Sequence, residues 1–163
     1  MPQMKQAQND HVALDQFDLA LLRQMQIDCR QSSSALSQTI PLSATAIQRR
    51  IKRLRECGVI LAEQALVAPN KLGNYLQLLV VLRLKKGGRE INSRVMARLQ
   101  PIAEIQQCYA VAGEFDYALI MLVRNMAEYE LLSKKLFQQD GDVERYETTV
   151  VMETIKQTFA VPL

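Results

Sequence analysis

The chain has 163 residues, of which 48% are hydrophobic and 23% charged, and its formal net charge of +3 at pH 7 comes wholly from residues 1–62, where eight Lys and Arg oppose five Asp and Glu. A basic segment joined to a neutral one is typical of a nucleic-acid-binding module attached to a part that does not contact phosphate, and this length accommodates one domain or two small ones. No apolar run is long enough to span a bilayer, and the polar N-terminus lacks the pattern of a signal peptide. The chain has a single histidine, His11, which nearly excludes a histidine-based metal site or catalytic triad.

The first elements expected along the chain are a polar arm and two helices. Residues 1–13 are polar and aperiodic, which predicts a flexible N-terminal arm. A helix is expected over Phe17–Asp28, capped by Asp15, and its apolar side supplies part of a small core: Leu14, Phe17, Leu21, Leu22 and Met25. A second, short helix is expected around Ser34–Ile40, started by Ser33 or Ser34 and ended by Pro41, which cannot continue it.

The third helix carries the most informative pattern. Ser43 is a good N-cap, and Ile47, Ile51 and Leu54 follow at helical spacing and define one buried face. The opposite face is polar and basic: Thr45, Arg49, Lys52 and Arg53, with Gln48 on its flank. Gly58 ends the helix, and Val59–Leu66 is expected to form a strand or wing. Such a helix fits a DNA major groove, so residues 14–62 are predicted to be a winged helix-turn-helix domain rather than to carry a merely solvated basic helix.

A linker or strand is expected over residues 63–73, followed by a second domain over residues 74–163. The hydrophobic periodicity there first predicts a strand over Tyr75–Leu84 that is buried on both faces, and then a helix that carries Ile91, Val95 and Leu99 and is ended by Pro101. Strands over Ile105–Val111 and Asp116–Val123, joined at Gly113-Glu114-Phe115, are expected next. A helix capped by Asn125, with Glu128 in a capping box, then packs through Met126, Tyr129, Leu132 and Leu136, and a strand over Val143–Val151 follows. This β-α-β-β-α-β order predicts a ferredoxin-like domain, so the fold class is α+β.

A four-stranded antiparallel sheet of this kind has helices on one face only, so its other face is expected to be apolar and bare. The residues expected to contribute are some of Leu79, Val81, Ala110, Ile120, Leu122 and Val150. Apolar patches of that size are rarely left in water, and the same face of a second subunit is the simplest cover. We therefore expect a homodimer formed through this domain.

The sequence resembles one family closely, the leucine-responsive and asparagine-responsive (Lrp/AsnC) bacterial transcription regulators. Four segments carry the resemblance in family order and reach nearly from Leu14 to the end of the chain: LDQFDLALLRQMQIDCR, LSATAIQRRIKRLRECGVI, VAGEFDYALIM and TTVVMETIKQT. The resemblance implies an N-terminal winged helix-turn-helix and a C-terminal ferredoxin-like effector domain. It also implies dimers that assemble further, often to octamers, and a small-molecule effector that is usually an amino acid.

The resemblance also implies where the effector binds: between dimers, near the loop that joins the second and third strands of the C-terminal domain. That loop maps onto residues 111–116, with contributions from around Met126 and from the last strand. The implied effector-binding residues are Ala112, Gly113, Phe115, Asp116, Met126, Thr148, Thr149 and Val150. Gly113 allows close backbone approach to a carboxylate and Asp116 can meet an α-ammonium group. The residues alone are equally consistent with a hairpin turn at Gly113 that Asp116 caps.

The predicted DNA contacts follow from side-chain chemistry. Thr45, Gln48 and Arg49 are assigned to base edges or their neighbourhood, since Arg pairs with guanine and Gln with adenine in the major groove. Lys52 and Arg53 are assigned to phosphate, and Ser34 and Ser43 to phosphate through their hydroxyls and the helix N-terminal amides. Arg50 lies nearer the buried edge, where we expect it to pair with an acidic residue of the first helix, such as Asp18.

Two other functions are alternatives to a ligand-responsive, sequence-specific regulator. An architectural protein that compacts DNA with little sequence preference would share every feature above. An enzyme similar to the sirohaem decarboxylases, which share this two-domain fold, is disfavoured because no histidine follows His11. No catalytic constellation, metal set or cofactor motif is present.

Two sets of smaller features were assigned structural roles. The acidic cluster of Asp140, Asp142 and Glu144 is interpreted as a solvated turn, because it lacks the spacing of a calcium loop. The three cysteines lack C-x-x-C spacing, which indicates packing roles in a reduced, cytoplasmic compartment: Cys29, Cys57 and Cys108.

Overall fold

The structure is a computed structural model that describes residues 11–86, 88–139 and 141–163. The chain folds as two compact units, one formed by residues up to 66 together with 158–163, and one formed by residues 67–157. Each unit has its own hydrophobic core. Most of the predicted N-terminal arm and Asp140 lie outside the described residues. No helix in the described part of the chain is long and apolar enough to cross a membrane.

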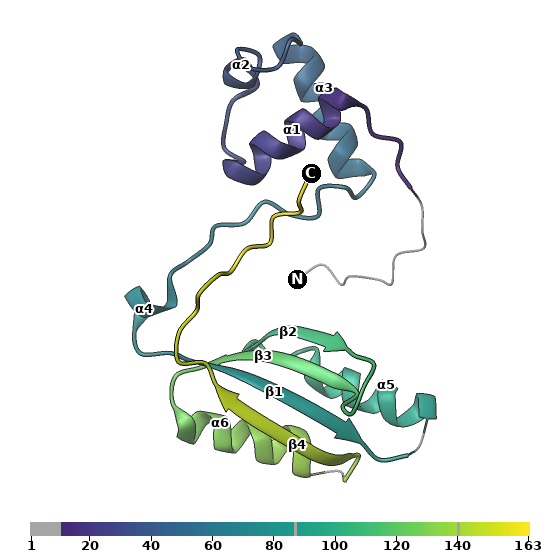
Figure 1. Ribbon diagram of the computed structural model, residues 1–163, viewed down its shortest axis with the longest axis vertical. Helices are drawn as coiled ribbons and strands as arrows, with labels where there is room; N and C mark the ends of the chain where they lie inside the picture. The colour runs from purple at the N-terminus through teal and green to yellow at the C-terminus, as the bar shows by residue number, and fades with distance from the viewer. Residues whose placement is uncertain (1–10, 87, 140) are drawn as a thin grey trace. The chain divides into compact units, whose positions relative to one another are not determined.

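The first unit contains three helices: α1 (Gln16–Ile27), α2 (Ser33–Leu36) and α3 (Ala44–Glu56) (Figure 1). Its core is built from the buried side chains of all three helices and the turn after α2: Leu21, Leu36, Ile40, Ile47 and Ile51. Asp15 caps α1 and Ser43 caps α3, as the sequence predicted. The cap of α2 is Ser32, whose hydroxyl accepts a hydrogen bond from the Ala35 amide at 3.1 Å, and not Ser33 or Ser34.

The strand or wing predicted over Val59–Leu66 is not formed, nor is a strand within residues 63–73. Gly58 ends α3 in the left-handed region at φ +73°, where the amides of Val59 and Ile60 both return to the Leu54 carbonyl. Residues 61–68 have no regular secondary structure and exposed side chains, and a short helix, α4 (Pro69–Leu72), follows. A strand needs a paired neighbour to satisfy its backbone groups, and the described residues of this unit supply none.

The segment of residues 158–163 packs with the first unit and contacts α1. The Gln26 side chain donates to the Val161 carbonyl at 3.0 Å and accepts from the Val161 amide at 2.5 Å. Arg23 donates to the main-chain oxygen of Leu163 at 3.1 Å. The chain therefore reaches α1 again after passing through the second unit.

The second unit is a four-stranded antiparallel sheet in the order β2-β3-β1-β4 (Figure 1). Its strands are β1 (Leu76–Leu84), β2 (Ile105–Ala110), β3 (Tyr117–Val123) and β4 (Val143–Val150). Three helical segments follow the predicted order: α5 (Gly88–Leu99), α6 (Met126–Ser133) and a π-helical turn (Lys134–Gln138) that continues α6. The predicted β-α-β-β-α-β order and the ferredoxin-like fold class are confirmed.

The helices cover one face of this sheet. On β1 and β3 every second residue points to the helices and is buried: Leu78, Val80, Leu82, Leu84, Tyr117, Leu119, Met121 and Val123. Val95 and Leu99 of α5, Tyr129 of α6 and Leu136 of the π-helical turn complete this core. Met126, which was predicted to pack inward with them, is 48% exposed instead.

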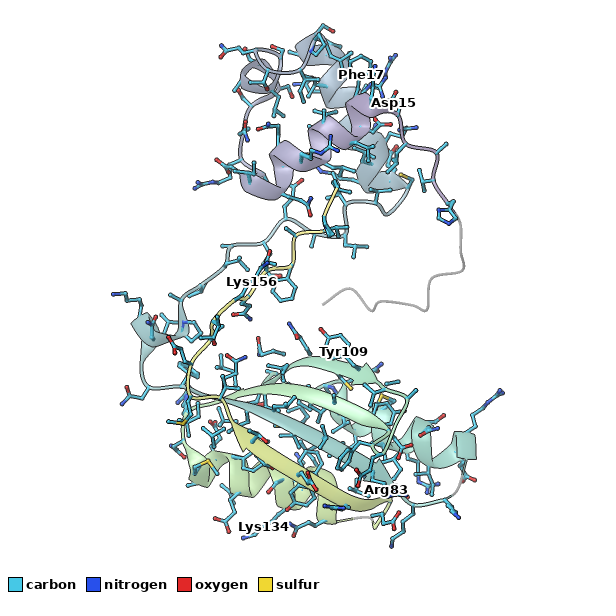
Figure 2. All side chains as sticks on the ribbon, viewed as in Figure 1. Asp15, Phe17, Arg83, Tyr109, Lys134 and Lys156 are labelled. Atoms are coloured by element: carbon cyan, nitrogen blue, oxygen red, sulfur yellow. The ribbon has the colours of Figure 1, made fainter. Side chains whose placement is uncertain are left out.

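The opposite face of the sheet carries the alternate residues of each strand. The apolar ones are Leu79 and Val81 of β1, Tyr109 of β2, and Ala118, Ile120 and Leu122 of β3. Figure 2 shows Tyr109 on one side of the sheet and Lys134, which follows α6, on the other. Two residues predicted for this bare face belong to the helix-covered side, because Ala110 pairs with Tyr117 and Val150 with Leu78. Within one chain β1 is therefore covered on one face only.

Candidate nucleic-acid interface and effector site

The exposed face of α3 gathers most of the residues predicted to contact DNA. The Ser43 hydroxyl accepts from the Ala46 amide at 3.2 Å and starts the helix, while Ile47, Ile51 and Leu54 anchor its other face in the core. The polar and basic residues remain exposed on the helix surface: Thr45, Gln48, Arg49, Lys52 and Arg53. Lys52 lies 3.7 Å from Glu56, an exposed pair one helical turn apart. Ser34 is exposed on α2, and its carbonyl accepts from the Ser37 hydroxyl at 2.7 Å.

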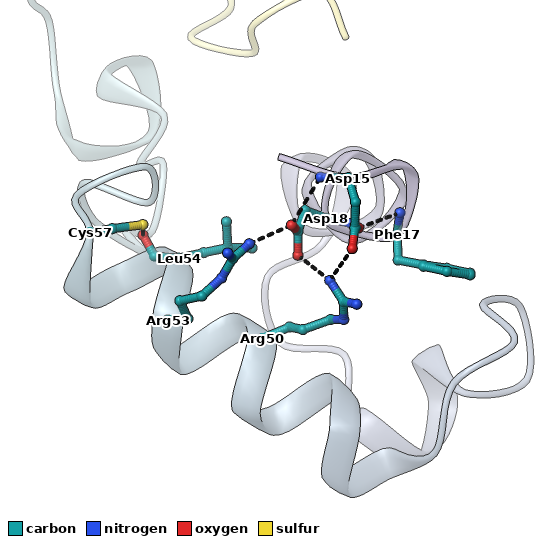
Figure 3. A network of polar contacts seen from close by, with 7 residues as sticks. All are labelled: Asp15, Phe17, Asp18, Arg50, Arg53, Leu54 and Cys57. Atoms are coloured by element: carbon teal, nitrogen blue, oxygen red, sulfur yellow. Dashed lines mark hydrogen bonds and ion pairs between the residues drawn. The ribbon is translucent and has the colours of Figure 1, made fainter. Parts of the chain in front are cut away.

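Two carboxylates at the start of α1 bind two arginines of α3 (Figure 3). Arg50 donates to Asp15 at 2.7 Å and to Asp18 at 2.8 Å, which confirms the predicted partner of Arg50. Arg53 also donates to Asp18. The bonds to Asp18 and Asp15 raise the pKa of Arg50 above its usual value. Bonding to the Asp18 amide, with further help from Arg50, lowers the pKa of Asp15 below 3.8.

Asp18 has a larger role in this unit than the sequence predicted, which offered it only as a candidate partner of Arg50. Its side chain is 1% exposed, and it closes a capping box by accepting from the Asp15 amide at 3.2 Å. The signal that identifies it is the spacing of Asp15 and Asp18, three residues apart at the start of an apolar helical pattern. That spacing does not reveal that Asp18 binds Arg53 as well.

The residues implied for effector binding form two groups on the second unit. The first is the turn between β2 and β3, with Ala112, Gly113, Phe115 and Asp116. Asp116 accepts from the Leu84 amide at 2.7 Å through one carboxylate oxygen, and its own amide donates to the Leu82 carbonyl at 2.8 Å. Asp116 therefore fixes the turn against the end of β1, as the structural alternative anticipated, while the residue remains exposed.

The second group is Met126 with the last residues of β4. Thr148 pairs with Val80, Thr149 with Leu79 and Val150 with Leu78. Leu78 and Leu84 lie six positions apart on β1, about 20 Å at 3.3 Å per residue. Within one chain the structure therefore does not bring Val150 to the turn that holds Asp116.

Side-chain direction also divides the last residues of β4. Thr148 points to the helices, where its hydroxyl shares a hydrogen bond with Tyr129, a residue not singled out as functional from sequence. Burial raises the pKa of Tyr129 above its ordinary value of 10.0. Thr149 lies on the bare face and is exposed. Thr149 is therefore the residue of this group best placed to meet another molecule on that face.

Asp142 and the three cysteines differ from what the sequence predicted. Asp142 is buried rather than solvated, because it accepts from Arg94 at 2.7 Å and lies 3.7 Å from Arg98. The cysteines are not buried packing residues, since Cys57 and Cys108 are exposed and Cys29 is half-buried. Partial desolvation of the Cys108 thiol on the helix-covered side nevertheless raises its pKa above 9.0. Among the described residues, no group of three or more His, Cys, Asp or Glu is placed to hold a metal ion.

A capped, basic recognition helix on a three-helix core, joined to a ferredoxin-like unit, defines a two-domain DNA-binding protein of the helix-turn-helix class. Comparison with known families agrees with this assignment. Residues 14–55 match the AsnC-type helix-turn-helix domain, and residues 77–161 match the Lrp/AsnC ligand binding domain. The chain belongs to the Lrp/AsnC family of transcription regulators, which confirms the resemblance seen in the sequence.

Individual relatives support the same assignment along nearly the whole chain. The leucine-responsive regulatory protein of Haemophilus influenzae is 39% identical over 90% of this chain and 88% of its own length. An AsnC family transcriptional regulator from Agrobacterium tumefaciens has a similar structure, with a TM-score of 0.85 and 28% identity over 91% of this chain and 97% of its own. The regulator NMB0573 from Neisseria meningitidis, solved as a complex with L-Met, has a TM-score of 0.85 and 25% identity over 92% of this chain and 97% of its own. These relatives are regulators and not enzymes.

Proposed function

We propose that this chain is a sequence-specific regulator of transcription whose DNA binding or assembly responds to an amino-acid effector. The observation that supports DNA binding most directly is the exposed face of α3, which presents Thr45, Gln48, Arg49 and Lys52 from a helix anchored on its other side. Arg and Gln side chains form bidentate contacts with guanine and adenine in the major groove. Lys52 adds a phosphate contact, which sets affinity without reading sequence.

An amino acid is the effector class that the ligand-binding unit supports best. The family match covers residues 77–161, and the structurally similar Neisseria regulator was solved with L-Met. The turn of residues 111–116 offers suitable chemistry, because Gly113 lacks a side chain that would block backbone approach and Asp116 carries a carboxylate for an α-ammonium group. Since Asp116 commits one oxygen to the Leu84 amide, the other oxygen is the one assigned to the ligand.

The proposed effector site needs more than one copy of the chain. The turn that holds Asp116 lies at the Leu84 end of β1, whereas Val150 pairs with Leu78 nearer the other end, so we assign Asp116 and Val150 to one site only between different copies. A homodimer through the bare sheet face, assembled further to an octamer or a similar ring, would supply such copies. Effector binding would then change assembly or dimer geometry, and with it the spacing of recognition helices on successive half-sites.

A thermal-shift screen of the purified protein against the twenty amino acids tests the effector proposal. At ten to a hundred times the dissociation constant, a ligand that binds only the folded protein stabilises it by about 1.4–2.7 kcal/mol, which is readily seen. The control variant is Asp116→Asn, because the amide oxygen can still accept from the Leu84 amide while the negative charge is gone.

The two outcomes of this screen are distinct. A stabilising amino acid whose shift is lost in Asp116→Asn supports the proposed site and identifies the signal. No shift with any amino acid overturns the effector proposal and leaves DNA binding standing. The ratio of affinities for a selected duplex and for a scrambled one then distinguishes a specific regulator from an architectural protein.

A further inference from the structure

The arginines on the flank of α3 are held in different ways by the carboxylates of α1 (Figure 3). Arg50 uses one nitrogen to bind both Asp15 and Asp18, lies 5.6 Å from the centre of the Phe17 ring, and has a side chain that is 25% exposed. Arg53 binds Asp18 through one terminal nitrogen, and 47% of its side chain is exposed. A guanidinium has five donors in a fixed fork. Arg53 therefore keeps an exposed edge while Asp18 fixes the other.

These residues surround a shallow hollow in the surface of the first unit. Asp15, Arg49, Arg50 and Arg53 line it, and Asp18 lies beneath the two arginines that it binds. The three guanidinium groups and the two carboxylates leave a local net charge of +1. A phosphodiester group carries one negative charge, and guanidinium donors match its oxygens in geometry. The local charge and chemistry of the hollow therefore fit one phosphate of a nucleic-acid backbone.

We propose that this hollow seats a phosphodiester group of the DNA backbone, and that Asp18 is a positioning residue that holds Arg53 ready to bind it. The proposal rests on the proposed DNA-binding function and adds a defined backbone contact beside the base-reading face of α3. A long, flexible side chain loses rotamer freedom when it binds a ligand. Because Asp18 already orders Arg53 in the free protein, this rotamer freedom is lost when the protein folds and not when DNA binds. The free energy of DNA binding is therefore more favourable.

The positioning role and simple electrostatics predict opposite changes in DNA affinity for the variant Asp18→Asn. Asp18 is negative, so charge alone predicts that Asp18→Asn binds DNA more tightly. If Asp18 positions Arg53, the same variant binds at least tenfold more weakly. The matched control is Glu56→Gln, which removes one negative charge from α3 without touching the network, since Glu56 is exposed and pairs only with Lys52 among the described contacts. We expect Glu56→Gln to bind DNA as tightly as the wild type or more tightly.

Affinity is measured by fluorescence anisotropy over a series of salt concentrations. The probes are a duplex of about 30 base pairs, or three helical turns, selected for binding to the wild-type protein, and a scrambled duplex of the same composition. A wild type that binds neither duplex overturns the DNA-binding function itself. A wild type that binds, with Asp18→Asn binding equally or more tightly, overturns the positioning role alone.

Arg53 variants keep the proposal testable if Asp18→Asn fails to fold, because they leave the Arg50–Asp18 pair intact. Arg53→Ala should weaken binding and reduce the slope of log K against log salt by about 0.9, the value for one lost phosphate contact. Arg53→Lys should keep the slope and still lose affinity, because a lysine lacks the fork that binds Asp18 and phosphate together. An unchanged slope in Arg53→Ala would overturn the phosphate site.

A double variant separates positioning from a structural role. If Asp18 acts through Arg53, Asp18→Asn added to Arg53→Ala causes no further loss of affinity in the folded protein. If the two losses add, Asp18 acts through Arg50 or through the fold of the unit rather than through Arg53, and its role in positioning Arg53 is wrong. Circular dichroism of each variant confirms that the comparison is made between folded proteins.

Discussion

Asp142 illustrates how a single buried carboxylate ties together segments that are distant in sequence. It follows a turn before β4, has a side chain that is 7% exposed, and binds Arg94 and Arg98 of α5. The hydrogen bond from Arg94 and the nearby positive charges hold the pKa of Asp142 below its ordinary value of 3.8. Because the folded pKa is lowered, the stabilisation is present above pH 3.8 and is lost as the pH falls through the folded pKa.

The variant Asp142→Asn tests this contribution. We expect it to be less stable than the wild type at pH 7, because the ion pairs of Asp142 with Arg94 and Arg98 are lost. Between about pH 5 and pH 2 its free energy of unfolding should fall less steeply than that of the wild type, since one titrating group is gone. Urea unfolding followed by circular dichroism at several pH values measures both effects. Glu144→Gln, at an exposed neighbouring position, should follow the wild-type curve, and an equally steep fall in Asp142→Asn would contradict the assignment.

Single residues show where sequence patterns are informative and where they are not. A local spacing indicates the capping role of Asp18, because Asp15 and Asp18 together form a capping box. The burial of Asp142 depends on Arg94, which is 48 positions away, and an acidic cluster beside a turn carries no sign of that contact. The exposure of Cys108 likewise depends on its place on β2, an edge strand of the sheet, because it pairs with the buried Leu119 and is exposed all the same. Roles set by local hydrogen bonds were predictable, and the pairing of Arg50 with Asp18 was predicted as well, but the distant partners of Asp142 were not.

At the scale of elements, Ser43 has two assigned roles that one substitution can separate. It caps α3 through the Ala46 amide, and it is predicted to contact phosphate. Ser43→Ala should lower the free energy of unfolding of the first unit by about 1 kcal/mol, the usual cost of a lost cap. Ser43→Asp should keep the stability, because Asp caps helices equally well, and should weaken DNA binding at least tenfold by placing a negative charge near phosphate.

The control for this pair is Asn125→Asp. Asn125 caps α6 by accepting from the Glu128 amide at 2.9 Å, so the change makes the same cap acidic in the other unit. Asn125→Asp should not lower stability as Ser43→Ala does, and it should not weaken DNA binding as Ser43→Asp does. Thermal unfolding and anisotropy with the same duplex measure the two properties. If Ser43→Asp binds DNA as the wild type does, Ser43 lies away from the phosphates and its role is that of a cap.

Elements were predictable wherever their own residues determine them. The alternation of apolar residues in β1 and β3 and the caps of α1 and α3 were enough to place these elements within a residue or so. The segment Val59–Leu66 has the composition of a strand but finds no neighbouring strand among the described residues, and backbone pairing cannot be read from one segment alone. The short helix α2 begins one residue earlier than predicted because three consecutive serines, Ser32 to Ser34, are all competent caps, and it ends at Leu36 rather than at Ile40 before Pro41.

At the scale of the whole molecule, sequence order gave no indication that the effector-binding residues fall into two groups. Asp116 is held at one end of β1 by Leu84, while Val150 pairs with Leu78 nearer the other end. Strand register decides this separation, and a resemblance between aligned residues does not contain it. The distance between the groups is a physical argument that the proposed site forms only when copies of the chain assemble.

The bare sheet face is the surface through which we expect the first step of that assembly. Its apolar side chains come from three neighbouring strands, and Ile120 lies on β3, an interior strand of the sheet between β2 and β1. In a twofold interface each substitution occurs twice, and a glutamate there places an unpaired charge in an apolar contact. Ile120→Glu should therefore raise the dimer dissociation constant at least a hundredfold, and sedimentation velocity over a range of concentrations measures it.

The matched control for this test is Leu131→Glu. Leu131 is an equally apolar residue on α6, 70% exposed and away from the bare face, so its change to glutamate should leave the dimer intact. Dissociation by both variants would indicate a general loss of folding, which circular dichroism detects. A wild type that sediments as a monomer, or an Ile120→Glu variant that stays dimeric, would place the interface elsewhere. A dimer broken only by Ile120→Glu would instead make the bare face the surface that brings the two effector groups into one assembly, and amino-acid binding should then be lost with it.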